Sequence, residues 1–186
     1  MIKIFVDTET TGFDPIKDDI HQIGAVCGNK HFQINLKFNR SKVKHNLPIP
    51  DDIMRFDSLE AVKMFIVFLT ECKQTFNVNE KFIFAGKNTK FDWLFLEQLF
   101  KQCGFSLFDY FHYTPFDLES VLIFAKDLDI IPYEQSIKLE EIVKYYGLRG
   151  TVHEALSDAY NTQKIYNILL KKFYLLKEDS EILSNI

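Results

Sequence analysis

Four acidic residues and one histidine of this chain lie in three short clusters, and each cluster borders a segment with a clear secondary-structure pattern. Residues 7–12 (DTETTG) directly follow an apolar run, and residues 88–92 (NTKFD) begin an amphipathic segment. Residues 153–158 (HEALSD) open the last long helical pattern. Any fold that brings these three distant clusters together must compensate the negative charge that they carry.

Four carboxylates in these clusters are candidates for one shared metal site. They are Asp7, Glu9, Asp92 and Asp158. Like charges that lie close together make an unfilled site unfavourable at neutral pH. Two hard divalent cations would relieve the repulsion, because all-oxygen ligand sets suit magnesium or manganese. The clusters therefore predict a site for two Mg²⁺ or Mn²⁺ ions, which is the apparatus of two-metal phosphoryl transfer.

The length and composition predict one globular domain. A chain of 186 residues can bury a sizeable core, and 47% hydrophobic with 26% charged residues is a globular mixture. The formal net charge of −4 argues at first against a nucleic-acid partner. Two divalent cations at the proposed site would add four positive charges, so net charge does not decide the partner. Aromatic residues make up 15%, and most of them should be core, although stacking on nucleobases is also open to them.

Cysteine usage and the first residues predict a soluble, cytoplasmic protein. Three cysteines, Cys27, Cys72 and Cys103, are odd in number and lack C-x-x-C spacing, which argues against a disulfide framework and a thiolate zinc site. The start of the chain leads directly into a strand-like run without signal-peptide architecture. Charges interrupt the longest apolar stretches well short of a membrane span, so we expect no membrane partner.

Hydrophobic spacing predicts a mixed sheet flanked by helices. The strands are expected at residues 2–7, 20–27, 31–38 and 81–85. The helices are expected at residues 58–73, 89–103, 116–128, 137–146 and 154–176. No repeat, linker or composition break marks a second domain. We therefore expect one domain over residues 1–176 and a short polar C-terminal tail over residues 177–186.

Each cluster taken alone also has a purely structural interpretation. Asp7 and Glu9 are two apart at a strand end and share a face, but a polar strand end entering a turn gives the same pattern. Asn88 and Asp92 are four apart on one helix face, yet Thr89 and Asp92 also fit a capping box, with Asn88 as an alternative cap. At each of these positions a purely structural role is therefore an alternative to metal binding.

The third cluster carries a geometric condition. His153 and Asp158 are five residues apart and would diverge by roughly 140° within a regular helix. They can reach one site only if His153 lies before the helix or in its first turn. Thr151 and Glu154 fit a capping box that would start the helix at this point. The alternative is an ordinary surface histidine near a helix start.

Taken together and in order, the clusters resemble the motifs of the DEDD exonuclease superfamily, specifically its histidine-containing branch. That branch includes the bacterial polymerase III proofreading subunit, ribonuclease T, oligoribonuclease and the animal TREX enzymes. Residues 7–12 match its D-x-E-T-T-G motif, Asp92 matches its helix-borne aspartate, and residues 153–158 match its H-x-A-x-x-D motif. The tyrosine-containing branch would have Tyr where this chain has Glu154. The resemblance runs from Met1 to about residue 170.

The resemblance implies a ribonuclease H-like α/β fold with a mixed five-stranded sheet. It implies stepwise 3′→5′ removal of nucleoside monophosphates from a nucleic acid with a free 3′ end, with single-stranded DNA as the expected substrate. His153 would be the general base for the attacking water, a role that suits a side chain titrating near neutrality. The metal ligands would be Asp7, Glu9, Asp92 and Asp158. The substrate-binding residues would be Thr10, Thr11, Gly12, Phe13 and Asn88, with Phe13 beside the terminal base.

Three alternatives stay open at this point. The same scaffold serves 3′→5′ exoribonucleases, and no motif here distinguishes RNA from DNA. A nucleic-acid-binding module without catalysis is a second alternative, although all four carboxylates and the histidine are present. A third is a subunit with a polymerase partner. The chain carries no long tether after its last helix, which favours a free-standing nuclease.

Overall fold

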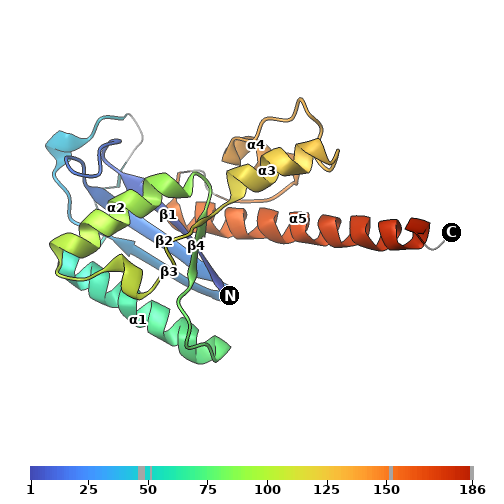
Figure 1. Cartoon of the computed structure of the whole chain (residues 1–186). Helices are drawn as coiled ribbons and strands as arrows, with labels where there is room; N and C mark the ends of the chain where they lie inside the picture. Colours follow the sequence, from blue (N-terminus) through green and yellow to red (C-terminus); the bar gives the residue numbers. More distant parts are fainter. Residues whose placement is uncertain (46–48, 51, 151–152, 185–186) are drawn as a thin grey trace.

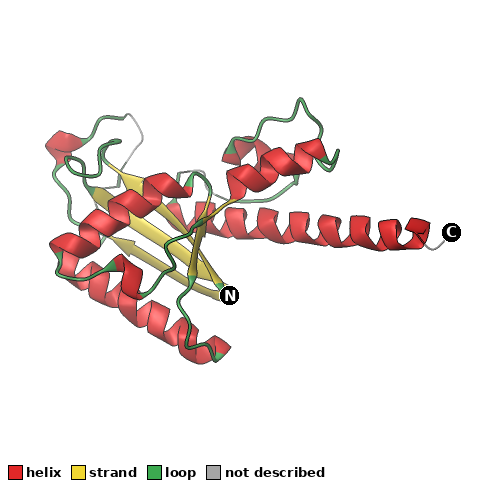
Figure 2. Ribbon diagram, in the orientation of Figure 1, coloured by secondary structure: helices red, strands yellow, loops and turns green. Residues whose placement is uncertain are grey.

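The five strands form one mixed sheet in the order β3-β2-β1-β4-β5 (Figures 1 and 2). The computed structural model describes residues 1–45, 49–50, 52–150 and 153–184. β1 pairs antiparallel with β2 and β2 with β3, whereas β4 lies parallel to β1 and β5 parallel to β4. The strands are β1 Lys3–Thr10, β2 Ile20–Cys27, β3 Lys30–Asn35, β4 Ile83–Gly86 and β5 Phe116–Asp117. This is the expected ribonuclease H-like α/β architecture.

Helices cover both faces of the sheet. α1 and α2 pack on one face over a core that includes Phe65, Leu96 and Ile4, while α5 packs on the other through Ala159. α3 and α4 lie beside α5, whose C-terminal half projects beyond the sheet (Figure 1). The helices are α1 Ser58–Phe76, α2 Thr89–Gln102, α3 Leu118–Asp127, α4 Leu139–Tyr145 and α5 Ala155–Ser184, with short 3₁₀ turns η1 Arg40–Lys42 and η2 Leu107–Asp109.

Alternation along β1 decides which side chains reach the site. Ile4 and Val6 belong to the core under α1 and α2, whereas Phe5 packs with Ala159 of α5. Because successive strand residues point to opposite faces, Asp7 and Glu9 follow Phe5 onto the α5 side. The register with β2 shifts between Glu9 and Thr10, where the regular pairing ends.

Gly24 of β2 lets the N-terminus of α5 lie directly on the sheet. A Cβ atom at this position would collide with the backbone between Ala155 and Leu156. The neighbouring Gln22 Oε1 accepts a hydrogen bond of 2.8 Å from Ala155 N. The start of α5, and with it Asp158, is therefore fixed against the central strands.

Several element boundaries differ from the expectation: β1 continues to Thr10 rather than ending at Asp7, and β3 ends at Asn35 rather than at Phe38. Two further differences have a clear physical reason. Residues 116–117, expected at the start of a helix, form β5, which is too short to show any alternation in the sequence. The last helix was expected to end at Leu176 before a polar tail, but α5 continues to Ser184. Residues 177–184 contain good helix formers such as Lys177 and no Gly or Pro, so nothing in them stops the helix. The division into a domain over 1–176 and a separate segment over 177–186 stays a prediction. No helix in the described ranges is long and apolar enough to cross a membrane.

Candidate active site

The four predicted carboxylates meet at the carboxyl end of β1. Asp7 and Glu9 come from β1 itself, Asp92 from the first turn of α2, and Asp158 from the first turn of α5. Burial raises the pKa of Asp7 well above its ordinary value, and the charges of Asp92, Asp158 and Glu9 raise it further. Asp7 therefore lies within electrostatic reach of the other three carboxylates.

The remaining carboxylates in the cluster are also shifted towards neutrality. Burial raises the pKa of Glu9 to about 7, with a further increase from Asp158 and a decrease from His153. Burial likewise raises the pKa of Asp92 to about 7 and that of Asp158 to about 6. Without a cation, this cluster holds protons at pH values where an ordinary carboxyl group is fully ionised.

Asp92 is held by Thr8 of β1. The backbone N–H and the hydroxyl of Thr8 both donate to Asp92 Oδ1, at 2.8 and 2.7 Å. These bonds counteract part of the burial effect on the pKa of Asp92. The capping-box interpretation of Thr89 and Asp92 is wrong, because the Asp92 carboxylate bonds to β1 rather than to the start of its own helix.

Asp117 performs the capping that the sequence assigned to Asn88 or Thr89. Its Oδ2 accepts from the Thr89 N–H at 3.0 Å and the Thr89 hydroxyl at 3.1 Å, and its Oδ1 accepts from Asn88 N at 3.1 Å. Oδ1 also accepts from Glu119 N at 2.9 Å, so one carboxylate caps both α2 and α3. Asp117 was not among the predicted site residues. An aspartate before an amphipathic helix was a signal for the α3 cap, but not for the bridge to α2.

Asn88 lies in a left-handed conformation with φ 59°, directly before α2. Its side chain is exposed and makes no capping hydrogen bond. The expected cap is therefore wrong for Asn88. Its expected role in substrate binding stays a prediction, and its amide is available for it at the edge of the sheet where the carboxylates meet.

His153 meets the condition set by the sequence. It lies in a turn before α5 with φ 62°, and the helix begins two residues later at Ala155. Single side-chain ligand atoms of Glu9, His153 and Asp158 lie within 4.8 Å of one another. His153 is exposed, so water can reach it beside the buried carboxylates. The expected capping box involves Thr151, which is outside the described residues.

The hydroxyls of Thr10 and Thr11 stabilise the turn that follows β1. Thr10 Oγ1 donates to Gly12 O at 2.7 Å, and Thr11 Oγ1 accepts from Asp19 N at 2.9 Å. A Cβ atom at Gly12 would collide with the Asp18 carboxylate, which explains why the turn needs glycine there. These three residues shape the wall next to Glu9, and their contact with a substrate stays a prediction.

Phe13 is exposed, as expected for a ring that meets a ligand. Its residue surface is 82% exposed, and its ring approaches that of Phe91 edge-on, with 6.3 Å between the centroids. A ring this exposed contributes little to the core, and its expected contact with the terminal base stays a prediction.

A cavity of about 290 Å³ opens beside His153 and Asp158. Two lysines, Lys87 and Lys138, line it, and Lys87 also pairs with Glu119 at 3.1 Å. Asn161, only 3% exposed, lines the cavity as well, and its Oδ1 has no hydrogen-bond partner among the described residues. None of these three residues was predicted, since none belongs to a motif. They bring positive charge and a polar group to the cavity beside Asp158.

The donor set fits hard divalent cations. Four carboxylates from three segments offer only oxygen ligands, and no lysine or arginine in the described part of the chain pairs with them. Cations can replace the protons that the raised pKa values of Glu9, Asp92 and Asp158 indicate.

Family comparison assigns this architecture to a class of protein. The family described as Exonuclease (RNase_T) matches residues 4–166, which is most of the chain. The chain therefore belongs to this exonuclease family, within the DEDD exonuclease superfamily. No curated protein matches the chain.

Solved structures of exonuclease I share the fold. The structure of E. coli exonuclease I with a 5cy-dT13 oligonucleotide matches with a TM-score of 0.67 and 16% identity, covering 100% of this chain and 45% of that one. The zinc-bound E. coli ExoI–ssDNA complex gives 0.70 and 16%, covering 98% and 43%. Exonuclease I from Methylocaldum szegediense gives 0.63 and 20%, covering 91% and 40%. The chain thus spans less than half the length of these proteins.

Proposed function

We propose that this chain is a metal-dependent 3′→5′ exonuclease of the histidine-containing DEDD branch, which releases nucleoside monophosphates from single-stranded DNA. The observation that carries the proposal is the convergence of Asp7, Glu9, Asp92 and Asp158 with His153 beside them. Membership of the exonuclease family supports the reaction class. The oligonucleotide and ssDNA complexes of exonuclease I support DNA as the substrate.

The four carboxylates would hold two Mg²⁺ or Mn²⁺ ions. Such ions supply Lewis-acid stabilisation of the charge that develops on the phosphoryl group. Thr8 contributes by fixing the orientation of Asp92 through its two hydrogen bonds. Asp117 contributes by fixing the turn from which α2, and hence Asp92, begins.

His153 would accept a proton from the attacking water through a ring nitrogen. The water oxygen forms the new bond to phosphorus, and the bond from phosphorus to the 3′-oxygen breaks. The products are a nucleoside 5′-monophosphate and a strand shortened by one nucleotide with a new 3′-hydroxyl. His153 is suited to this role because it is exposed to solvent and lies next to Glu9 and Asp158.

The residues around the cluster would position the 3′ end. Phe13 offers an exposed ring for stacking on the terminal base. Lys87 and Lys138 lie where they would attract the phosphates. The other proposed contacts to the terminal nucleotide are Thr10, Thr11, Gly12 and Asn88. A polymerase partner and a cytoplasmic location stay predictions.

Cleavage of labelled oligonucleotides tests the proposal directly. The protein is incubated with 5′-labelled single-stranded DNA and with RNA of the same sequence, with and without Mg²⁺. A ladder that shortens from the 3′ end of DNA only when Mg²⁺ is present is expected. Faster shortening of RNA than of DNA would identify the protein as an exoribonuclease. Binding without cleavage would identify a binding module.

A further inference from the structure

The outward face of α5 carries a row of polar and aromatic side chains that the proposed reaction does not use (Figure 1). Tyr160, Lys164, Asn167, Lys171 and Tyr174 follow one another at spacings of three and four residues, so they share one face of the helix. Tyr160 is half-buried, and the other four are exposed. At 1.5 Å per residue this α5 row is about 21 Å long.

The opposite face of α5 belongs to the proposed site and to the core. Asp158 lies roughly 160° around the helix axis from Tyr160, because it precedes Tyr160 by two residues. Ile165 and Leu169 are fully buried in the cluster that also contains residues of α3 and α4. The α5 row is therefore a surface separate from the carboxylate cluster, and its exposed side chains are not needed for the core.

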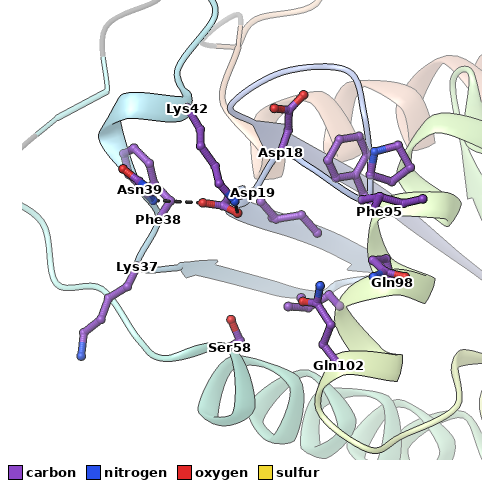
Figure 3. A pocket seen from close by; sticks show the side chains of 14 residues that line it. Asp18, Asp19, Lys37, Phe38, Asn39, Lys42, Ser58, Phe95, Gln98 and Gln102 are labelled. Carbon is purple, nitrogen blue, oxygen red and sulfur yellow. Dashed lines mark hydrogen bonds and ion pairs between the residues drawn. The ribbon is translucent and has the colours of Figure 1, made fainter.

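The α5 row lies in a basic segment of an acidic protein. Residues 159–177 contain four lysines and no aspartate or glutamate, whereas the whole chain has a net charge of −4. Neither Lys164 nor Lys171 forms an ion pair with another described residue. In the pocket shown in Figure 3, by contrast, the Lys42 ammonium group pairs with Asp19 at 2.7 Å. The ammonium groups of the α5 row are thus available to an anionic partner.

Aromatic rings lie at both ends of the α5 row. The Lys164 ammonium group lies 5.7 Å from the centre of the Tyr160 ring, and the His31 ring of β3 lies 6.2 Å from the same ring. Tyr174, at the other end, is 61% exposed. Lysines bind phosphates and aromatic rings stack on bases of any sequence, so this combination is typical of surfaces that bind single-stranded nucleic acid. The row contains no aliphatic side chain, which a lipid surface would require.

The α5 row begins next to the proposed active site. Asn161 lines the cavity that also contains His153 and Asp158, and Lys164 follows Asn161 by three residues on the adjacent surface of the helix. A strand with its 3′ end at the carboxylates can therefore pass through this cavity and reach Lys164 within one helical turn. Lys171 lies two turns further along the same face.

We propose that the α5 row binds single-stranded DNA upstream of the 3′ end, with phosphates on Lys164 and Lys171 and a base stacked on Tyr174. The inference rests on the proposed exonuclease function and adds to it a contact region outside the catalytic centre. Long strands are held by the centre and by the row, whereas strands of a few nucleotides reach only the centre. The row thus determines the preference for long strands and leaves the rate of the chemical step unchanged.

The test compares long and short strands in charge variants. Single-turnover removal of the first 3′ nucleotide from 5′-labelled single-stranded DNA is measured over a range of enzyme concentrations, in Mg²⁺ and at several salt concentrations. The strands have about 20 and about 4 nucleotides, which are above and at the lower end of usual single-strand site sizes. The charge variant is Lys164→Gln/Lys171→Gln. The matched control is Lys63→Gln/Lys101→Gln, which removes two exposed lysines from α1 and α2 on the other face of the sheet.

In the wild type the long strand should half-saturate at a roughly tenfold lower enzyme concentration than the short one. In Lys164→Gln/Lys171→Gln most of this advantage should be lost, while the maximal rate and the short strand stay as in the wild type. The slope of log affinity against log salt on the long strand should become shallower by about 1.4, which is about 0.7 for each lost phosphate contact. Tyr174→Ala should weaken saturation by the long strand without changing that slope, because it removes a ring and no charge.

The control variant should behave as the wild type does. A wild type without a long-strand advantage, an unchanged advantage in Lys164→Gln/Lys171→Gln, or an equal loss in the control would overturn the inference while leaving the exonuclease function intact. Normal saturation by Tyr174→Ala would overturn the stacking contact. A wild type that removes no nucleotide from either strand would overturn the proposed function itself.

Discussion

Two acidic regions of this molecule differ in how their charge is compensated. In the loop after β1, Asp14 pairs with Lys17 at 3.0 Å and Asp18 with Lys44 at 2.7 Å. The hydrogen bond from Lys17 lowers the pKa of Asp14, and that from Lys44 lowers the pKa of Asp18. In the carboxylate cluster a few residues away, burial and neighbouring acids raise the pKa of every member.

The difference separates acids that are paired with lysines from the acids that we propose bind cations. The loop acids obtain their cations from lysines of the same chain. The cluster acids have no such partner in the described ranges, and their repulsion destabilises the folded protein. A cluster of this kind is maintained at a cost in stability, which is expected at functional sites rather than at structural ones.

The largest expected effect comes from removing one charge of the cluster. Asp7→Asn and Asp158→Asn should each abolish cleavage, because each removes a ligand charge that localises a cation. Both should leave the metal-free protein as stable as the wild type or more stable, since a source of repulsion is lost. Nucleotide release and thermal unfolding are measured on the same preparations.

Asp18→Asn is the matched variant in the other region. It should lower the unfolding temperature because Lys44 loses its ionic partner, yet it should keep the Mn²⁺ affinity measured by calorimetry. Normal turnover in Asp7→Asn, or loss of Mn²⁺ binding in Asp18→Asn, would remove the distinction between the two regions.

The next effect in size concerns the histidine beside the cluster. His153→Ala should slow single-turnover cleavage by about 10²–10⁴-fold, the usual range for loss of a general base. Mn²⁺ affinity should change little, because His153 is proposed as a base and not as a ligand. An undiminished rate in His153→Ala would show that His153 is an ordinary surface histidine and not the general base.

Phe13, at the boundary between the two regions, should have a smaller effect. Phe13→Ala should weaken binding of the 3′-terminal nucleotide by about 1–3 kcal/mol, the usual contribution of one base–aromatic stack. The fold should be unaffected, because the ring is 82% exposed. Substrate saturation curves and thermal melts are compared with the wild type. A variant that unfolds but saturates normally when folded would assign the ring to the core.

The smallest effect is a pH dependence of opposite sign in the two regions. The raised pKa values of Glu9 (about 7) and Asp158 (about 6) mean that the folded protein holds more protons than the unfolded chain between pH about 4 and 7. Stability contributed by the cluster therefore falls as the pH rises through this window. Asp18, with its lowered pKa, contributes stability that is fully present above the ordinary value of 3.8 and is lost only as acid protonates it.

Buried His21 complicates the lower half of the same window. Burial lowers the pKa of His21 to about 4, so its contribution to stability rises with pH between about 4 and 6.5. The contribution of the cluster is therefore best measured above pH 6.5, by urea unfolding without metal. Stability should fall there as the pH rises, the slope should shrink in Asp158→Asn, and Mg²⁺ should abolish it. A wild-type stability that rises with pH above 6.5 would contradict the raised pKa values.

Much of the fold was predictable because its signals are local. β2 has the predicted bounds Ile20–Cys27, and α2 begins at the predicted Thr89. Both segments carry a pattern of apolar residues that a window of the sequence contains in full. The strand β5 was missed because two residues cannot show a period, and it exists only through pairing with β4. The end of α5 was misplaced because helix formers continue past Leu176 while the apolar pattern fades.

The sequence by itself determined which residue types could form a site, since three motifs in order name the carboxylates and the histidine. Only the tertiary structure decided how they are held: Gly24 admits the start of α5, Thr8 orients Asp92, and Asp117 joins two helix starts. Hydrogen bonds between residues 84 positions apart, such as that from Thr8 to Asp92, leave no periodic trace in the chain. Asn161 could not be predicted as a site residue for the same reason, because its surroundings arise only when distant segments pack together.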